Sequence, residues 1–207
     1  MIKYGIIGCG MMGREHIRNI LLIPNTSIVG IYEPNPEMCG LAKVLAPSAE
    51  FCGTLTELLT TIEFDCLVIA TPNFQHIDDL YEILKYVNKP VLIEKPIVTN
   101  LEDTKRINDF LQKYKAPVWV AMEYRYMPVL QEFIQQEKLV TGGVKMLSIR
   151  EHRYPFLEKV KNWNRFNKYS GGTFVEKCCH FFDLMRLINK SNPCLLYTSP
   201  SPRDVEE

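Results

Sequence analysis

The feature that most constrains the fold is a regular alternation of short apolar runs and helical stretches over residues 1–122. The apolar runs are rich in β-branched residues, which is typical of buried strands. Strands that alternate with helices of this length favour a parallel sheet that is covered on both faces. We therefore predict a doubly wound α/β domain of the Rossmann type over residues 1–122.

The individual elements follow from this alternation. The predicted strands are 3–8, 27–33, 49–53, 65–71, 90–94 and 117–122. The predicted helices are 14–23, 36–46, 55–62, 74–87 and 100–114. Thr54 and Glu57 have capping-box spacing at the start of the third helix, and Asn100 is expected to cap the last one.

The pattern changes after Met122. A helix at 128–139 precedes an alternating segment at 144–154, which is typical of a strand in an antiparallel sheet. An aromatic and basic loop at 155–172 leads to a helix at 173–188. We predict that residues 123–193 begin a second, α+β domain with a mainly antiparallel sheet, which would supply part of a substrate and catalytic site.

The last residues differ from all that precede them. Cys194–Asp204 reads CLLYTSPSPRD and matches one reading frame of a transposase adaptor that is used to prepare sequencing libraries. A genuine Ser/Pro-rich linker is the alternative. We expect residues 194–207 to be foreign and the natural chain to be interrupted near Pro193. A chain cut there would lack most of the second sheet, so we expect these 207 residues alone to be poorly stable and inactive.

Charge and composition exclude several kinds of partner. The 24 basic and 24 acidic residues cancel, which gives no electrostatic reason to expect nucleic acid or an anionic membrane. No apolar run reaches the roughly 18–20 residues that a membrane span needs. The N-terminus reads directly into a strand and not into a secretory signal. Seven scattered cysteines without a CxxC pair predict free thiols in the cytoplasm.

A glycine loop connects the first predicted strand to the first helix. Gly8, Gly10 and Gly13 form the pattern GxGxxG in this context. The first glycine permits the tight turn, the second lets a pyrophosphate approach the backbone, and the third permits close packing of helix and strand. The helix N-terminus then offers free N–H groups to the anion. This pattern predicts a dinucleotide site.

Glu33 ends the second predicted strand, which is where a dinucleotide site of this type has an acidic residue. A carboxylate at this position accepts hydrogen bonds from the ribose hydroxyls of the adenosine and repels a 2′-phosphate. We therefore predict NAD as the cofactor rather than NADP. A solvated acid at a strand end is the alternative.

Further residues resemble a known family. These are the run ATPN at residues 70–73 with His76, the run EKP at 94–96, the run EYRYMP at 123–128, and the later Trp163, Gly171-Gly172 and E…H..D pattern. Together with the glycine loop they resemble the Gfo/Idh/MocA family of glucose–fructose oxidoreductase and inositol dehydrogenase, from residue 2 to about residue 190. The resemblance implies a two-domain NAD(P)-dependent oxidoreductase, which is often a homo-oligomer.

The resemblance also implies a set of cofactor-binding residues. In such a protein Glu94 and Lys95 would lie near the nicotinamide, with Lys95 beside the substrate hydroxyl. The complete predicted set is Gly8, Gly10, Met11, Met12, Gly13, Glu33, Thr71, Asn73, His76, Glu94 and Lys95.

The predicted helix 173–188 carries a narrow polar stripe. At about 100° per residue, Glu176, His180 and Asp183 fall within an arc of about 60°, and most of the remaining circumference is apolar. Adjacent cysteines point about 100° apart on a helix, so Cys178 and Cys179 do not both fit one metal ion with His180. We predict no metal site and no redox thiol pair.

Three simpler interpretations of the stripe stay open. Glu176 has the spacing of a capping box with Thr173, and His180 is compatible with a satisfied core histidine. Asp183 can pair with Arg186 at i+3. In the resembled family this helix begins with an aspartate four residues before the catalytic histidine, and Glu176 stands in that place.

The resemblance thus implies a catalytic set of Lys95, Glu176 and His180. We expect His180 to take the substrate proton, Glu176 to orient it, and Lys95 to polarise the same oxygen. Arg125, Trp163, Arg165 and Asp183 are candidate substrate residues, with ordinary surface packing as the alternative for the first three. The implied activity is hydride transfer between NAD and a secondary hydroxyl or ketone of a polyol or sugar. The alternative is a dinucleotide-binding regulatory protein without catalysis.

Overall fold

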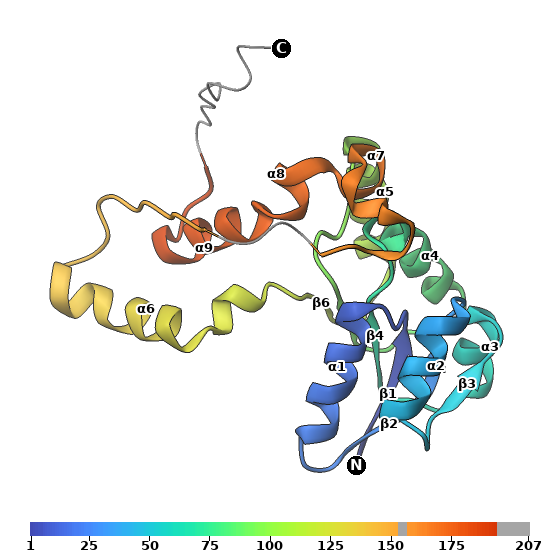
Figure 1. Ribbon diagram of the computed structural model, residues 1–207. Coiled ribbons are helices and arrows are strands. Elements are labelled where there is room, and N and C mark those ends of the chain that lie inside the picture. The colour runs from blue at the N-terminus through green and yellow to red at the C-terminus, as the bar shows by residue number, and fades with distance from the viewer. Residues whose placement is uncertain (153–156, 194–207) are drawn as a thin grey trace. The chain divides into compact units, whose positions relative to one another are not determined.

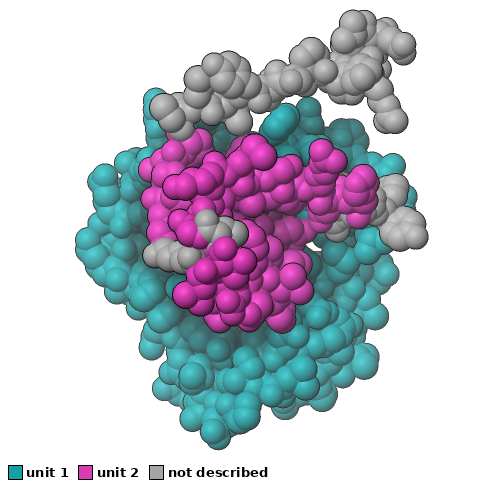
Figure 2. All heavy atoms as spheres, turned by 90° about the vertical axis from the view of Figure 1, so that its left-hand side faces the viewer, with its two compact units in different colours: residues 1–122, 153–179 teal, residues 123–152, 180–207 magenta. Residues whose placement is uncertain are grey.

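The computed structural model describes residues 1–152 and 157–193. The chain divides into two compact units, coloured separately in Figure 2. Unit 1 comprises residues 1–122 and 153–179, and unit 2 comprises residues 123–152 and the chain from His180 onward. Unit 1 thus draws on both predicted domains, whose limits remain a prediction. The expected foreign tail, 194–207, lies outside the described residues.

Unit 1 is built on a six-stranded parallel sheet with the strand order β3-β2-β1-β4-β5-β6 (Figure 1). The strands are β1 Ile2–Ile7, β2 Thr26–Tyr32, β3 Glu50–Cys52, β4 Cys66–Ile69, β5 Val91–Ile93 and β6 Val118–Val120. The order reverses between β1 and β4, and ligands of such sheets bind at the carboxyl ends of the strands at this point. The predicted fold class is confirmed.

Five helices connect these strands. They are α1 Met11–Leu22, α2 Pro36–Leu45, α3 Leu55–Thr61, α4 His76–Tyr86 and α5 Leu101–Lys113, with a short 3₁₀ turn, η1 Asn73–Gln75, before α4. The Asn100 side chain caps α5 by accepting from the N–H of Asp103 at 2.9 Å. The Thr54 side chain caps α3 in the same way, by accepting from the N–H of Glu57 at 3.1 Å. The Glu57 carboxylate accepts in turn from the N–H of Gly53, whereas a capping box would have it accept from that of Thr54.

Both faces of the sheet are buried. Neighbouring residues of β1 point to opposite sides, so Ile6 packs with residues of α1 and α2, and Ile7 packs with residues of α3, α4 and α5. All of these side chains are removed from water. Burial on both faces explains why the strands are continuously apolar rather than alternating.

Unit 2 begins with a 3₁₀ turn, η2 Glu123–Tyr126, and α6 Pro128–Thr141, which ends at Gly142 in the left-handed conformation. The strand predicted at 144–154 is not formed over the described residues 144–152. A strand without a partner leaves its backbone donors and acceptors unpaired. Within the described part of unit 2 no second strand is present to pair with this segment.

The predicted helix 173–188 is interrupted. It forms α8 Gly172–Glu176 and α9 Cys179–Asn189, separated by a turn at 177–178. The carbonyl of Thr173 accepts from the N–H of Lys177 at 2.9 Å and also from that of Cys178 at 3.1 Å. The second bond spans five residues, which widens the turn and rotates the chain that follows. The prediction of one continuous helix is therefore wrong.

The loop before α8 also has structure of its own. It contains the 3₁₀ segment η3 Val160–Arg165 and the single-turn helix α7 Asn167–Ser170. Gly171 then adopts a left-handed conformation with φ of 78° and is the N-cap of α8. None of the helices in the described ranges is long and apolar enough to cross a membrane.

Candidate functional site

The glycine loop packs as tightly as the sequence predicts. Gly8 has φ of 88°, and a Cβ there would lie 2.8 Å from the carbonyl carbon of Ala70. A Cβ on Gly13 would lie 2.1 Å from the carbonyl oxygen of Gly8. Neither position has room for a side chain, so both glycines are required by the backbone geometry of the β1–α1 turn.

Gly10 differs from its two neighbours in the pattern. It is the N-cap of α1, and no side chain caps the helix there. A Cβ on Gly10 would meet no atom within 4 Å. The N-terminus of α1, where Met11 is exposed and Met12 is half-buried, therefore has open space beside Gly10. An open helix N-terminus beside a tight glycine turn fits the pyrophosphate of a dinucleotide.

Glu33 is engaged with the same loop. Its Oε2 accepts from the N–H of Cys9 at 2.5 Å, and its Oε1 accepts from that of Asn35 at 2.8 Å. The carboxylate is thus held at the carboxyl end of β2 rather than freely solvated. Burial and the neighbouring carboxylate of Glu33 raise the pKa of the Cys9 thiol to about 12, so this thiol is not reactive.

Two of the predicted cofactor residues that follow β4, Thr71 and His76, form hydrogen bonds to protein groups. The Thr71 hydroxyl donates to Oδ2 of Asp79 at 2.6 Å. His76 is fully buried, with Nδ1 2.7 Å from the carbonyl oxygen of Pro96 and Nε2 3.0 Å from that of Thr71. Burial lowers the pKa of His76. His76 thus joins the loop after β4 to the loop after β5, and Thr71 joins the loop after β4 to α4.

Asn73 is the exception in this loop. It is only 7% exposed, and its side-chain nitrogen has no hydrogen-bond partner among the described residues. A buried donor without a partner costs free energy unless a ligand supplies an acceptor. Asn73 follows β4 at the carboxyl edge of the sheet, so this donor fits a site that a bound dinucleotide would complete.

Glu94, at the end of β5, has a partner that the sequence did not reveal. Its Oε1 lies 2.7 Å from Nε2 of His16 on α1, and its Oε2 accepts from the N–H of Lys95 at 3.2 Å. Burial alone would raise the pKa of Glu94, but His16 and Lys95 outweigh it, and the pKa lies below its usual value. A single histidine on a helix carries no pattern that would have predicted this pairing.

Lys95 contacts α8 directly. Its Nζ donates to the backbone carbonyl of Glu176 at 2.9 Å. Glu176 is buried, and burial raises the pKa of its carboxyl group, while the charges of Lys95 and Lys159 oppose that effect. Lys159 is thus a second cation, besides Lys95, that acts on the Glu176 carboxyl group, and the sequence did not single it out. The Thr173 capping box is wrong, because α8 begins at Gly172 without a side-chain cap.

His180 lies in unit 2 and is 2% exposed. Its ring stacks on that of Tyr124, with centroids 4.3 Å apart and planes at 7°, and its Nε2 is 3.4 Å from Oε1 of Glu123. Glu176 was expected to orient His180 because four residues separate them on one helix. Because the helix is interrupted at 177–178, Glu176 and His180 do not lie one turn apart on a continuous helix.

Arg125 and Asp183 form a bidentate ion pair within unit 2. Two guanidinium nitrogens each donate to a carboxylate oxygen at 2.5 Å. Hydrogen bonding to Asp183 raises the pKa of Arg125. The alternative pairing of Asp183 with Arg186 is wrong, since Arg186 donates to the side chain of Asn192 at 3.0 Å.

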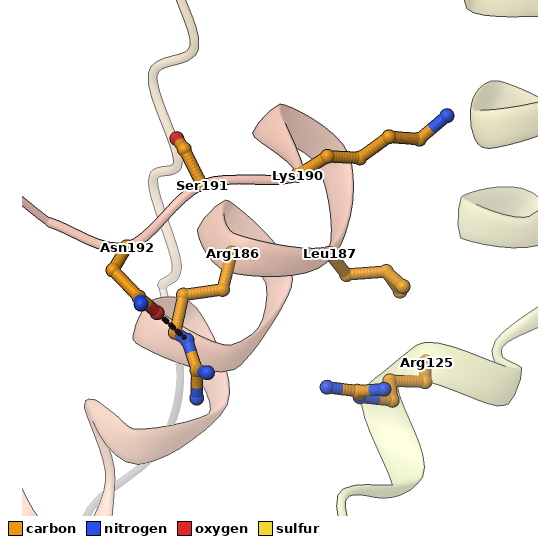
Figure 3. A pocket seen from close by; sticks show the side chains of 6 residues that line it. All are labelled: Arg125, Arg186, Leu187, Lys190, Ser191 and Asn192. Carbon is orange, nitrogen blue, oxygen red and sulfur yellow. Dashed lines mark hydrogen bonds between the residues drawn. The ribbon is translucent and has the colours of Figure 1, made fainter.

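A cavity of about 350 Å³ in unit 2 is lined by Arg125, Arg186, Leu187, Lys190, Ser191 and Asn192 (Figure 3). Although basic residues line this cavity, they are not arranged to bind an anion. Arg125 is paired with Asp183, Arg186 is bonded to Asn192, and the Lys190 side chain points away from both arginines in Figure 3.

The two remaining substrate candidates differ. Trp163 packs edge-on against Phe74 of η1, with centroids 6.1 Å apart, so it holds η3 against the loop after β4. The Arg165 guanidinium lies 3.4 Å from the carboxylate of Glu158, and both side chains are exposed. This arrangement matches the alternative interpretation of Arg165 as an ordinary surface residue. In the described ranges no three His, Cys, Asp or Glu side chains are grouped closely enough to hold a metal ion.

Comparison with known proteins bears on this arrangement. The profile of the oxidoreductase family with an NAD-binding Rossmann fold, Gfo/Idh/MocA, matches residues 2–122, and that of the family's C-terminal alpha/beta domain matches residues 131–193. The rhizopine catabolism protein MocA of Rhizobium meliloti is 25% identical, over 92% of this chain and 58% of its own. Inositol 2-dehydrogenase of Rhizobium meliloti strain 1021 is also 25% identical, over 93% of this chain and 56% of its own.

Among solved structures, myo-inositol dehydrogenase from Lactobacillus casei, in complex with NAD(H) and myo-inositol, is 28% identical and superimposes with a TM-score of 0.61. The match covers 69% of this chain and 42% of that one. The chain spans about half the length of the curated relatives it matches.

Proposed function

The chain belongs to the Gfo/Idh/MocA oxidoreductase family, and from this premise we propose that the full-length protein is an NAD-dependent dehydrogenase. It transfers a hydride between NAD and a secondary hydroxyl or ketone of a polyol or sugar. The observation that carries the proposal is the bond of 2.9 Å between Lys95 and α8. It joins the end of β5, at the ligand-binding edge of the sheet, to the segment that contributes Glu176.

NAD would be held by the glycine loop and the acid of β2. The open N-terminus of α1 at Gly10 would receive the pyrophosphate, and Glu33 would receive the ribose hydroxyls. The unpaired side-chain nitrogen of Asn73 would donate to the cofactor. A bound nicotinamide supplies the hydride acceptor for the oxidation of an alcohol.

The proposed chemistry of the protein concerns the hydroxyl proton of the substrate. The Lys95 ammonium stabilises the oxygen as negative charge develops on it, which is the largest contribution in many such sites. His180 accepts the proton as the general base. Glu123 is 3.4 Å from this histidine and would stabilise its charged form. In this proposal the role of Glu176 is to place a carboxylate near Lys95. It does not orient His180, as it would if both residues lay on one continuous helix.

The substrate class is supported by the relatives. Several proteins that resemble this chain are named as inositol dehydrogenases, and one of them was solved with myo-inositol bound. We propose a polyol or a sugar as the substrate, a homo-oligomeric full-length protein, and the cytoplasm as its location. His76 would act by fixing the two loops of the site to one another, and Thr71 by fixing the loop after β4 to α4.

The test is a substrate panel. The full-length protein and its His180→Ala and Lys105→Met variants are incubated with NAD and a series of polyols and sugars, and NADH is followed by absorbance. NAD binding is measured separately by calorimetry. Lys105 is an exposed residue of α5 and serves as the control.

We expect turnover of at least one substrate by the wild type and the Lys105 variant, with a loss of about 10²–10⁴-fold in the His180 variant. All three proteins should bind NAD equally. If the wild type binds NAD and turns over nothing in the panel, the dehydrogenase proposal fails. That result would favour the dinucleotide-binding regulatory protein.

A further inference from the structure

His16 on α1 holds the side chain of Glu94, the residue that precedes Lys95. Its Nε2 lies 2.7 Å from Oε1 of Glu94, and both side chains are largely removed from water, with 18% of His16 and 8% of Glu94 exposed. The two residues are 78 positions apart in the chain and both lie in unit 1. Neither the glycine loop nor the proposed chemistry uses His16, so this pairing has a role that is not yet assigned.

The hydrogen bond between the two side chains has a defined direction. Burial would raise the pKa of Glu94, but the hydrogen bond to His16 and the charge of Lys95 hold the pKa below its usual value. An ionised carboxylate accepts hydrogen bonds and has no proton to give. His16 therefore donates through Nε2, whether or not Nδ1 also carries a proton.

Glu94 transmits this constraint to Lys95. Its second carboxylate oxygen, Oε2, accepts from the backbone N–H of Lys95 at 3.2 Å. The backbone N–H of Glu94 donates to the carbonyl of Ile69 in β4 at 2.9 Å, which fixes the main chain of Glu94 at the carboxyl end of the sheet. One carboxylate thus joins α1 to the backbone of Lys95 through two charge-assisted hydrogen bonds.

Both ends of this series of hydrogen bonds are anchored. Gly13 packs α1 so closely against the glycine turn that a Cβ there would lie 2.1 Å from the carbonyl oxygen of Gly8. At the other end, the Lys95 ammonium donates to the backbone carbonyl of Glu176 at 2.9 Å. Lys95 is therefore held twice, by its backbone N–H and by its ammonium group. The first of these bonds comes from the carboxylate that His16 holds.

We propose that His16 is a positioning residue for Lys95, on which it acts through the carboxylate of Glu94. Without His16 the buried carboxylate would lose the partner of Oε1 and would turn toward water or take up a proton. Either change weakens the bond from the Lys95 N–H to Oε2 and loosens the backbone that carries the ammonium group. The role in catalysis rests on the proposed dehydrogenase function, whereas the effect on the backbone of Lys95 does not.

The structural test is amide hydrogen exchange, followed by NMR in the full-length protein with isotope-labelled lysine. The Lys95 signal is identified by its loss in Lys95→Arg, and Lys43 in α2 is the internal reference. In His16→Leu the Lys95 N–H should exchange faster by roughly tenfold relative to Lys43. His16→Gln, whose amide can donate to the same oxygen, and Asn19→Leu, at an exposed position of α1, should exchange like the wild type.

Two outcomes of the exchange measurement overturn the proposal. One is unchanged exchange at Lys95 in His16→Leu. The other is an equal acceleration at Lys95 and Lys43, which would show that His16 only stabilises the fold. His16→Met replaces the Leu variant if that variant does not fold.

The catalytic test separates kcat from cofactor binding. His16→Leu should lower kcat by about 10- to 100-fold, the range typical of a residue that orients a catalytic group. His16→Gln should recover most of this loss, and both variants should bind NAD as the wild type does. An equal loss of kcat in the two variants, or a loss of NAD affinity with kcat unchanged, would contradict the proposal. If the wild type turns over no substrate, the proposed function fails, and hydrogen exchange still decides whether His16 positions Lys95.

Discussion

The side-chain nitrogen of Lys95 donates a hydrogen bond of 2.9 Å to the backbone carbonyl of Glu176, 81 positions further along the chain. A backbone carbonyl holds the ammonium group in place without neutralising it. A cation fixed in this way is already oriented before a substrate arrives, which is the arrangement that electrostatic catalysis requires.

Replacing Lys95 should therefore affect the chemical step. We expect Lys95→Met to lower kcat/KM of the full-length enzyme by about 10²–10³-fold, because the charge that stabilises a developing alkoxide is lost. Lys95→Arg keeps the charge with a different shape and should recover part of the loss. Steady-state kinetics and an NAD titration separate the two effects. A Met variant that keeps most of its kcat/KM would contradict this role.

Gly13 and Gly10 should respond oppositely to alanine. In Gly13→Ala the new methyl group meets the carbonyl of Gly8 at 2.1 Å, and the free energy of unfolding should fall by about 2–3 kcal/mol. In Gly10→Ala it meets open space, so stability should be unchanged while NAD binding weakens by roughly tenfold. Thermal unfolding and calorimetric titration measure the two quantities. Equal destabilisation of both variants would refute the assignment.

Glu33 should set both loop geometry and cofactor choice. Glu33→Ala removes the acceptor of the Cys9 and Asn35 N–H groups and the negative charge that disfavours a 2′-phosphate. We expect the dissociation constant for NAD to rise by roughly tenfold and the preference for NAD over NADP to shrink. The readout is the ratio of the two dissociation constants. A ratio equal to that of the wild type would show that Glu33 does not discriminate between the cofactors.

The ion pair of Arg125 and Asp183 should contribute to the stability of unit 2. Arg125→Met is expected to lower the free energy of unfolding by about 1–3 kcal/mol, less than a fully buried pair because the Arg125 side chain is 35% exposed. Arg186→Met, which removes the residue that the sequence offered as an alternative partner of Asp183, should change it by less than about 0.5 kcal/mol. Urea unfolding of the three proteins compares them. A larger effect at Arg186 would contradict the observed pairing.

Asp79 should make stability depend on pH. Burial raises the pKa of this carboxyl group from 3.8 to about 6, so the folded state binds the proton more tightly than the unfolded state. The free energy of unfolding should fall as pH rises from about 4 to about 6, by roughly 2–3 kcal/mol, and the loss should be complete above that range. Asp79→Asn should abolish this component, and the exposed Asp109→Asn should retain it. Parallel pH profiles for wild type and Asp79→Asn would rule the effect out.

The sequence by itself determined the order of strands and helices over residues 1–122, the glycine turn and the caps at Thr54 and Asn100. Each of these depends on residues only a few positions apart, through side-chain periodicity, backbone sterics or one local hydrogen bond. The position of Glu33 at the end of β2 follows from the same regularity, because every βα unit brings the carboxyl end of its strand to one edge of the sheet.

Only the tertiary structure decided how the charged groups pair. His16 with Glu94, and Arg125 with Asp183, join residues that are 78 and 58 positions apart, and many partners are compatible with the same local pattern. The helix is interrupted after Glu176 where the Thr173 carbonyl accepts a second hydrogen bond. The periodicity of apolar residues in the sequence does not predict such a bond. Local chemistry fixes which elements form. The pairing of buried charges is fixed by packing, since each charge needs a partner within a few ångström in the folded chain.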